Sequence, residues 1–323
     1  MHKDPSYYIQ GVLDNNRLML ARTITLVESI LTSHQEIAKH VINELLPHTG
    51  KAVRLGITGV PGAGKSTFIE SFGLWLIEKG HRVAVLAVDP SSSLSRGSIL
   101  GDKTRMEALA RHPSSFIRPS PSGGALGGVA RKTRETIIAC EAAGYDIILI
   151  ETVGVGQSEV TVRSMVDFFL LMQIAGAGDE LQGIKKGIME LADLVVVNKA
   201  DGQNIQAAEL ACRELNNALH YLRHATPGWT TKAITCSATE KTGLPEVWYE
   251  IERFVKQGGI SGVLEGRRQS QVLQWFESLL TEAVLNRFHS DPRVNQMLPE
   301  LKSQVGKGEM PVMLAVQKLL DGA

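Results

Sequence analysis

The 323-residue sequence has few cysteines, no excess of either charge and no long hydrophobic run. It has three cysteines, Cys140, Cys212 and Cys236. They contain no CxxC pair, and their number is not the even number expected of a disulfide-bonded set, which is typical of buried, reduced thiols. Lys plus Arg and Asp plus Glu both number 34, so the chain lacks the basic field that holds nucleic acid or an anionic membrane. No apolar run reaches the roughly 20 residues of a membrane-spanning helix, and the N-terminus shows no apolar signal region. We therefore expect a cytoplasmic protein with no nucleic-acid partner and no membrane segment.

The first part of the chain, residues 1–50, has the pattern of a helical arm. Ile37, Val41 and Leu45 recur at the spacing of one helix face. The whole chain is 43% hydrophobic and 21% charged, which is enough for one large core with extensions. We expect this arm to have an apolar stripe that must be buried.

The central part, residues 51–258, contains short and nearly continuous apolar runs separated by stretches of helical length. Such runs are typical of strands that helices cover on both faces. We expect an α/β fold with a doubly wound, mostly parallel sheet. The expected strands are 53–58, 83–88, 147–151, 168–173, 194–197 and 233–235.

The last part, residues 259–323, begins with a glycine-rich stretch and continues with helical patterns. A wide apolar stripe is expected on its first helix, and two sites are expected to break the helices. The two helical extensions either pack on the central domain or form a homodimer contact. The stripe consists of Val272, Trp275, Phe276, Leu279 and Leu280, and the breakers are Asp291-Pro292 and Pro299.

A glycine-rich loop follows the first expected strand and opens a helix. It matches the GxxxxGKS phosphate-binding pattern, in which glycines let backbone amides point at phosphate oxygens and the helix N-terminus adds partial positive charge. Lys65 is expected to reach the β and γ phosphates of a nucleotide as a catalytic residue, and Ser66 to offer its hydroxyl to Mg²⁺. The expected nucleotide-binding residues of this loop are Gly59, Pro61, Gly62, Ala63, Gly64, Lys65, Ser66 and Thr67.

Acidic residues that follow the expected strands are the candidates for the metal site. Mg²⁺ prefers oxygen ligands, usually one or two carboxylates with phosphate and water. Asp89 ends the second expected strand and Glu151 ends the third. We assign both as catalytic residues, in the metal shell or orienting the attacking water, with Asp102 as a further metal candidate. For Asp102 the alternative is a helix cap, and the sequence does not divide the roles among the three.

A glycine-containing segment, 152–159, follows the third expected strand. Gly154, Gly156 and Gln157 lie where a loop has to respond to the γ phosphate. We expect this segment to act as a switch that is released when the γ phosphate is lost.

The sequence Asn-Lys-Ala-Asp follows the fifth expected strand and matches the NKxD pattern of guanine-binding proteins. The Asp201 carboxylate accepts from the N1–H and the exocyclic amine of guanine, whereas adenine has neither donor there, so GTP is favoured over ATP. Lys199 is expected to lie along the base, and Asn198 to tie this loop to the phosphate loop. Ser237 and Ala238 follow a later strand, where a backbone N–H can reach guanine O6.

Long stretches of the chain, between about residues 54 and 250, resemble the MeaB/ArgK/MMAA-type GTPases. These proteins are chaperones of adenosylcobalamin-dependent acyl-CoA mutases such as methylmalonyl-CoA mutase, and some bacterial members carry an older label as an arginine/ornithine transport kinase. The matching stretches are GITGVPGAGKSTFIE, AVDPSSSLSRGSILGDKTRM, FIRPSPSGGALGGVARKTRE, GYDIILIETVGVGQSEV, QIAGAGDELQGIKKGIMELADLVVVNKAD and CSATEKTGLPEVW.

The resemblance implies a P-loop NTPase fold of the SIMIBI class that hydrolyses bound GTP to GDP and phosphate with Mg²⁺. It also implies a homodimer that is held together by the C-terminal extension, residues 259–323. GTP binding and hydrolysis would gate the delivery of adenosylcobalamin to the mutase and protect the mutase from inactivation. A third mobile segment, 175–187, would signal to the mutase through Gln182 and Lys185; an ordinary loop before a helix is the alternative.

Two other functions remain open. One is an ATP-dependent kinase that acts on a periplasmic amino-acid-binding protein of a transport system; the NKAD sequence and the lack of an HRDxxxxN catalytic loop argue against it. The other is a nickel-inserting GTPase, which the nine dispersed histidines and the lack of a Cys/His cluster disfavour.

Overall fold

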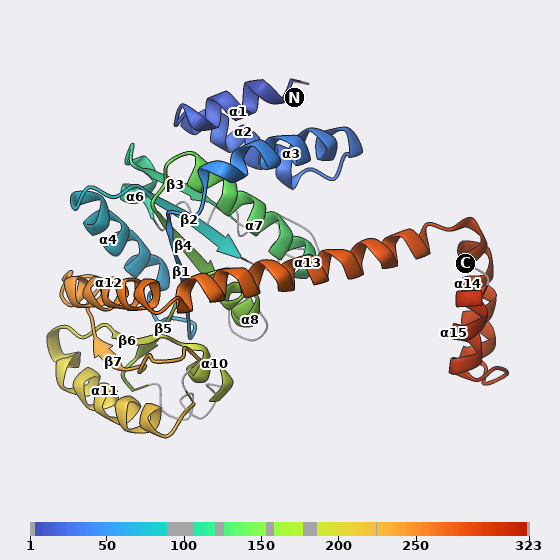
Figure 1. The fold of residues 1–323 in the computed structure, drawn as a ribbon. Helices are drawn as coiled ribbons and strands as arrows, with labels where there is room; N and C mark the ends of the chain where they lie inside the picture. Colours follow the sequence, from blue (N-terminus) through green and yellow to red (C-terminus); the bar gives the residue numbers. More distant parts are fainter. Residues whose placement is uncertain are drawn as a thin grey trace. The chain divides into compact units, whose positions relative to one another are not determined.

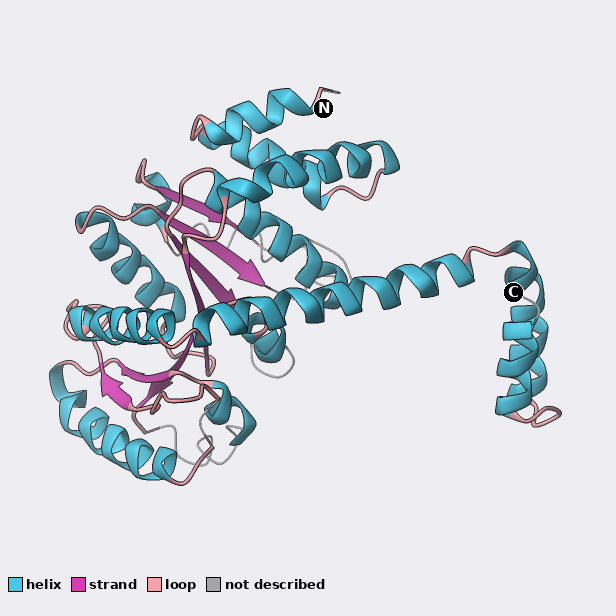
Figure 2. Ribbon diagram, viewed as in Figure 1, coloured by secondary structure: helices cyan, strands magenta, loops and turns pink. Residues whose placement is uncertain are grey.

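The computed structural model describes residues 4–88, 106–119, 126–152, 158–176, 186–223 and 225–321. By its internal contacts the chain divides into two units, Met1–Arg268 and Gln269–Ala323. The first unit contains a seven-stranded, fully parallel sheet with helices on both faces, which confirms the predicted α/β fold (Figures 1 and 2). Within the described residues, no helix combines the length and the apolar character that a membrane span needs.

The sheet has the strand order β3-β2-β4-β1-β5-β6-β7. Strand β1 is central and pairs with β4 on one side and β5 on the other. In open parallel sheets, ligands bind beyond the carboxyl ends of such central strands. The strands are β1 Val53–Gly59, β2 Val83–Val88, β3 Ser115–Arg118, β4 Ile147–Thr152, β5 Phe168–Ile174, β6 Leu194–Asn198 and β7 Ala233–Thr235.

The edge strand β3 is missing from the strands predicted from the sequence. Its four residues contain only two apolar side chains, a run too short to stand out as a buried strand. Ser115 is fully buried because its hydroxyl donates to the carbonyl oxygens of Leu109 and His112. These short-range hydrogen bonds and the parallel pairing with β2 stabilise a strand that the apolar pattern did not indicate.

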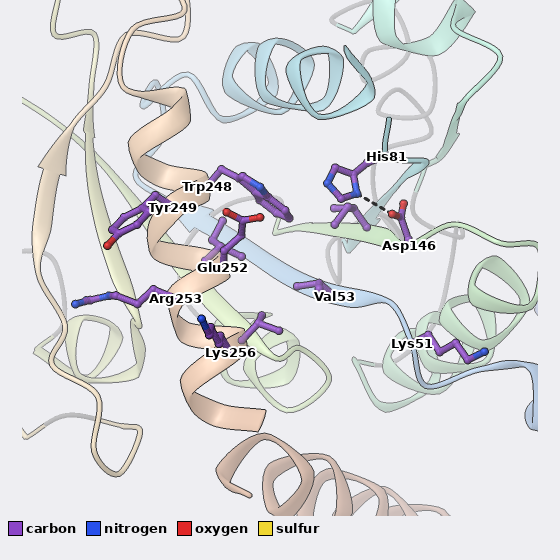
Figure 3. Close-up of a pocket in the computed structure, with 12 residues that line it drawn as sticks. Lys51, Val53, His81, Asp146, Trp248, Tyr249, Glu252, Arg253 and Lys256 are labelled. Atoms are coloured by element: carbon purple, nitrogen blue, oxygen red, sulfur yellow. Dashed lines mark hydrogen bonds and ion pairs between the residues drawn. The ribbon is translucent and has the colours of Figure 1, made fainter. Parts of the chain in front are cut away.

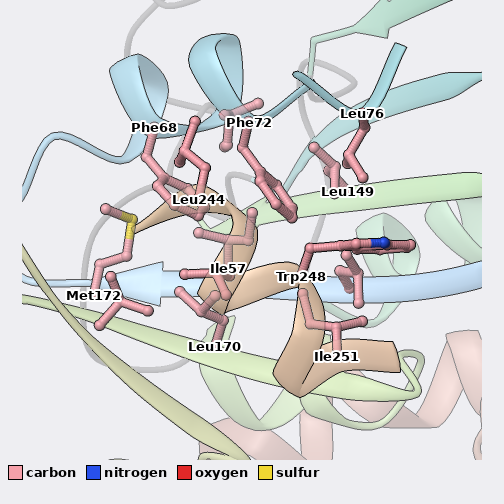
Figure 4. Close-up of a cluster of buried hydrophobic side chains, with 14 of the residues drawn as sticks. Ile57, Phe68, Phe72, Leu76, Leu149, Leu170, Met172, Leu244, Trp248 and Ile251 are labelled. Carbon is pink, nitrogen blue, oxygen red and sulfur yellow. The ribbon is translucent and has the colours of Figure 1, made fainter. Parts of the chain in front are cut away.

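One face of the sheet is covered by α4, Lys65–Glu78, and α12, Leu244–Ile260. Their fully or largely buried side chains converge over the central strands (Figure 4). Each buried Phe or Leu of this kind contributes about 1.5–3 kcal/mol of transfer free energy. This packing fixes α4, and with it the phosphate-loop lysine in its first turn. Residues drawn together in Figure 4 include Ile57, Phe68, Phe72, Leu149, Leu170, Leu244, Trp248 and Ile251.

The opposite face is covered by α7, Leu126–Ala142, α8, Ser158–Arg163, and α11, Ile205–His220, with α10, Lys186–Leu191, beside them. Side chains of β5 and α8 lie so close to β1 that a Cβ on Gly56 would be 2.6 Å from Phe169 of β5 and 3.0 Å from Val162 of α8. Only glycine therefore fits at this point of β1, and α8 lies directly against the central strand.

The N-terminal arm forms three helices, α1 Pro5–Leu13, α2 Arg17–Glu28 and α3 Thr32–Leu45, which pack on one another and on α7. Asp4 and Asn16 cap the first two helices by accepting from backbone amides. The predicted stripe of α3 is buried at Val41 and Leu45. Of the two alternatives for this arm, packing on the central domain is therefore the one that the structure shows, because its helices lie against α7.

The remaining helices include α13, Val263–His289, α14, Pro292–Gly306, and α15, Val312–Asp321. Asp291 caps α14, but Pro299 lies inside α14 and does not break it, contrary to the prediction. A proline in a helix interior removes one hydrogen bond, and here the contacts of α14 with α15 support the helix. The short elements are η1 Leu46–His48, α6 Glu107–Arg111 and η2 Gly202–Asn204.

The three cysteines are free, and two of them, Cys140 and Cys236, are buried as predicted. Burial raises the pKa of the Cys236 thiol to about 12. Cys212 is only partly buried, because it lies on the flank of α11 rather than on the face that packs on the sheet. The prediction of buried thiols is therefore confirmed for two cysteines and only in part for Cys212.

Candidate functional site

The phosphate loop joins the carboxyl end of β1 to the first turn of α4. Gly62 and Gly64 have φ angles of +78° and +81°, a left-handed conformation that glycine adopts without strain. A Cβ on Gly64 would also lie 2.8 Å from Asn198 Nδ2, so this position excludes a side chain. The loop therefore curls as the phosphate-binding pattern requires, with Ala63 buried and Pro61 and Gly62 exposed.

Lys65 begins α4 and turns back over the loop. Its Nζ donates to the Gly59 carbonyl oxygen at 2.9 Å. Burial lowers the pKa of Lys65, while the carboxylates of Glu151 and Glu159 act in the opposite direction. The loop thus holds a half-buried ammonium group, whose charge the two acids favour, at the carboxyl end of the central strand.

Ser66 and Glu151 form the part of the predicted metal site that the structure describes. The Ser66 hydroxyl donates to Glu151 Oε1 at 3.3 Å, and Glu151 is 5% exposed at the end of β4. A hydroxyl and a carboxylate oxygen at this distance are the type of donors that Mg²⁺ takes. Thr67 is exposed in the same first turn of α4.

Asn198, the last residue of β6, connects three loops. Its Nδ2 donates to the Ala63 carbonyl oxygen at 2.8 Å, which is the predicted tie to the phosphate loop. Its Oδ1 accepts from the Ala238 amide at 3.1 Å. Lys199 follows in the left-handed region with φ of +61°, and Asn204 Nδ2 donates to its carbonyl oxygen at 2.7 Å. The base loop is therefore fixed to the phosphate loop by one buried side chain.

Asp201 is held by Ser237. The fully buried Ser237 hydroxyl donates to Asp201 Oδ2 and accepts from the Glu240 amide at 3.1 Å. The Ser237 amide itself donates to the Thr242 carbonyl oxygen at 3.0 Å. In this structure Ser237 and Ala238 thus donate within the protein, and they orient Asp201 and Asn198 rather than presenting a free amide.

Seven predicted residues lie outside the described part of the chain. They are Asp89, Asp102, Gly154, Gly156, Gln157, Gln182 and Lys185. The residues that the structure brings together are the phosphate loop, Glu151, and the two base loops at 198–201 and 237–238.

Glu159 is a residue at this site that the sequence analysis missed. It is only 2% exposed, lies in the first turn of α8 and acts electrostatically on Lys65. The available signal was an acidic residue at the end of the predicted switch segment, in the first turn of a helix. A single Glu in a first turn is also a common helix-dipole partner, so this signal is weak by itself.

A separate cavity of about 690 Å³ lies at the other end of the sheet, by the amino ends of β1 and β4 (Figure 3). Trp248 and Tyr249 of α12 line it, together with a hydrogen-bonded pair in which His81 Nδ1 and Asp146 Oδ2 are 2.7 Å apart. Because the phosphate loop lies at the carboxyl ends of the strands, this cavity is not part of the nucleotide site.

Together, the parallel sheet, the phosphate loop and the linked base loops define a P-loop GTPase. The chain matches the family model described as "Methylmalonyl Co-A mutase-associated GTPase MeaB" over residues 20–293. It therefore belongs to the MeaB family, and it is a GTPase.

Several relatives share most of the chain. A probable GTPase of Mycobacterium tuberculosis is 53% identical over 96% of this chain and 93% of its own length. The GTPase ArgK of Escherichia coli is 50% identical over 88% and 86%. The mitochondrial methylmalonic aciduria type A homolog of Mus musculus is 47% identical over 96% and 77%. A solved structure of a LAO/AO transport system kinase superposes with a TM-score of 0.79 at 39% identity, covering 98% of this chain and 96% of that one.

Proposed function

We propose that this GTPase gates the loading of adenosylcobalamin into an acyl-CoA mutase such as methylmalonyl-CoA mutase, and protects that mutase from inactivation. The observation that carries the proposal is the family match over residues 20–293, whose description names association with methylmalonyl-CoA mutase. The relative named after methylmalonic aciduria type A, at 47% identity, supports the same client.

The nucleotide site supplies the switch for this role. Loop amides around Gly62 and Gly64 orient the phosphates, Lys65 stabilises negative charge on them, and Asp201 selects guanine. The donors Ser66 and Glu151 fit a Mg²⁺ ion, which when bound neutralises charge on the phosphate oxygens. In this proposal Glu151, near the end of β4, holds the metal ion or orients the attacking water.

The loading assay uses the full chain, apo-methylmalonyl-CoA mutase and adenosylcobalamin. Formation of the holo-mutase, followed by its cobalamin absorbance, is expected to differ between GTP, a non-hydrolysable GTP analogue and GDP. The Lys65→Ala protein should lose this nucleotide dependence, while Lys39→Ala, an exposed lysine of the arm, should retain it. Loading that is equal with and without nucleotide would contradict the proposed role.

The alternative is an ATP-dependent kinase acting on a periplasmic amino-acid-binding protein, a role suggested by the name of the solved relative, LAO/AO transport system kinase. The two functions separate in one assay with labelled ATP or GTP and such a binding protein. Phosphate transfer from ATP to the binding protein, with GTP left intact, would replace the mutase proposal by the kinase.

A further inference from the structure

The cavity at the amino ends of the strands has one wall that is made by α12. Four of its lining residues, Trp248, Ile251, Glu252 and Val255, lie at positions i, i+3, i+4 and i+7, which share one side of a helix. Trp248 and Ile251 are buried, because both also belong to the core that α12 forms with the sheet. Glu252 lines the same cavity but is exposed to solvent. This wall is therefore an apolar and aromatic surface with one carboxylate at its edge.

The opposite wall is made where three strands begin. Val53 of β1 and Ile147 of β4 are partners in the parallel pairing and supply two apolar side chains. His81 lies just before β2 and Asp146 just before β4, with 2.7 Å between His81 Nδ1 and Asp146 Oδ2. The other carboxylate oxygen of Asp146 accepts from the Arg82 amide at 2.7 Å. The two polar side chains of this wall are therefore held in place by contacts within the protein.

Two acceptors at the cavity have no hydrogen-bond partner among the residues that the structure describes. The Glu252 carboxylate forms neither a hydrogen bond nor an ion pair there. The neutral His81 ring donates through Nδ1 to the Asp146 carboxylate, which leaves Nε2 as an acceptor. The His81 and Trp248 rings face each other edge to face with centroids 5.1 Å apart, and Figure 3 shows the two side chains pointing toward one another. The cavity thus combines acceptors with an aromatic ring.

Basic side chains also lie at the rim of the cavity, and most of them are directed elsewhere. Arg253 Nη2 donates to Glu250 Oε2 at 2.7 Å, and its guanidinium lies over the Trp229 ring at 4.5 Å from the centroid. Figure 3 shows the side chains of Arg253 and Lys51 pointing away from the centre of the cavity. Lys256 lies one turn beyond the free carboxylate of α12 and forms no ion pair with it. The protein therefore leaves that carboxylate without a fixed counter-ion.

We propose that this cavity binds a small primary alkylamine, whose ammonium group pairs with Glu252 and whose apolar stem packs on Trp248. The three N–H donors of an ammonium group match the Glu252 carboxylate and His81 Nε2, and the face of an indole ring attracts a cation. The alkyl stem is removed from water between the two apolar walls. A volume of about 690 Å³ is within the range of small-molecule sites. The site is separate from the nucleotide and from any mutase client, so a negative loading assay leaves it standing.

The test measures affinity by titration calorimetry on the full chain with GDP bound, with hexylammonium as the probe. Hexanol has the same stem without the charge, and hexanoate reverses the charge, so each should bind at least about tenfold more weakly. Hexyltrimethylammonium keeps the charge but has no N–H donor, and its affinity should be lower by about threefold or more. Equal affinities of hexylammonium and hexanol would overturn the proposal. So would tighter binding of hexanoate, because it would identify an anion site.

Variants of exposed residues locate the probe in this cavity. Glu252→Gln removes the charge that pairs with the ammonium group, so hexylammonium should bind about fivefold more weakly or worse, while GTP hydrolysis stays unchanged. Lys256→Gln removes the neighbouring cation and should strengthen binding by about twofold. Glu214→Gln, at an exposed position of α11, is the matched control and should bind the probe as the wild type does. Wild-type affinity in Glu252→Gln would show that the probe binds elsewhere and would reject the proposal.

Discussion

At the residue scale, Lys65 is the cation of the phosphate loop, and its Nζ donates to the Gly59 carbonyl oxygen at 2.9 Å. Lys65→Ala should weaken GTP binding by about 10- to 100-fold, the loss expected for one or two hydrogen bonds to a charged group. It should also abolish hydrolysis. Titration calorimetry and phosphate release measure both effects, with the exposed Lys39→Ala as control. Wild-type turnover in Lys65→Ala would reject the phosphate-site assignment.

We assign the preference for guanine to Asp201, whose carboxylate the buried Ser237 hydroxyl holds in place. Asp201→Asn replaces one carboxylate acceptor by an amide donor that faces the guanine N1–H and amine. The preference for GTP over ATP should fall by about 2–4 kcal/mol, the scale of an unpaired buried partner. Competition binding with both nucleotides measures this, and Asp14→Asn in the arm should leave the preference unchanged. An unaltered preference in Asp201→Asn would place the base elsewhere.

At the element scale, the start of α13 is fastened to the amino end of β5. Arg268 donates to both carboxylate oxygens of Asp167, at 2.7 and 2.6 Å, and to the carbonyl oxygens of Gly50 and Ala52. The Asp167 side chain is 1% exposed. Removal of the cation leaves a buried carboxylate without its ion pair, which is strongly destabilising.

Arg268→Ala should therefore lower the free energy of unfolding by about 3–5 kcal/mol, as measured by urea denaturation of the full chain. Arg213→Ala is the matched control, because Arg213 forms an exposed helical pair with Glu209 and its loss should cost about 0–1 kcal/mol. A similar effect of the two variants would show that the Asp167 pair contributes no more than a surface pair.

Elements differed in how well the sequence predicted them. Strands β1, β2 and β4 to β7 were evident because each is a nearly continuous apolar run, as is typical of strands that helices cover on both faces. Strand β3 was not, since its apolar run is short and it is held by parallel pairing with β2. The rule that proline ends a helix predicts a break at Pro299, but α14 continues through this residue. Local rules failed where tertiary contacts outweighed them.

At the scale of the whole molecule, the apolar stripe of α13 is exposed in a single chain. Val272, Phe276 and Leu280 are 57%, 59% and 47% exposed, respectively, and they repeat every four residues along one side of the helix. An exposed apolar stripe of this kind is typical of an interface between protein chains. We propose that it forms the homodimer contact, which the C-terminal extension, residues 259–323, would provide.

Phe276→Glu should weaken the dimer by more than about tenfold, because it places an unpaired charge in an apolar contact. Sedimentation velocity over a range of protein concentrations measures the change. Gln274→Glu adds the same charge on the other side of α13 and should leave the dimer intact. A wild-type chain that sediments as a monomer at every concentration would exclude the homodimer.

The sequence by itself determined the fold class, the phosphate loop and the guanine-binding loop. These depend on local chemistry, in which glycines permit a conformation, an apolar run requires burial and a short pattern carries the ligand groups. Only the tertiary structure showed that Asn198 and Ser237 join these loops, and that Arg163 of α8 lies 3.4 Å from the buried Asp193 carboxylate. Such contacts join residues far apart in the chain. A single charged residue belongs to no periodic pattern, so the sequence does not indicate which residue it contacts. Their energies arise from burial, which exists only once the sheet and its helices have packed together.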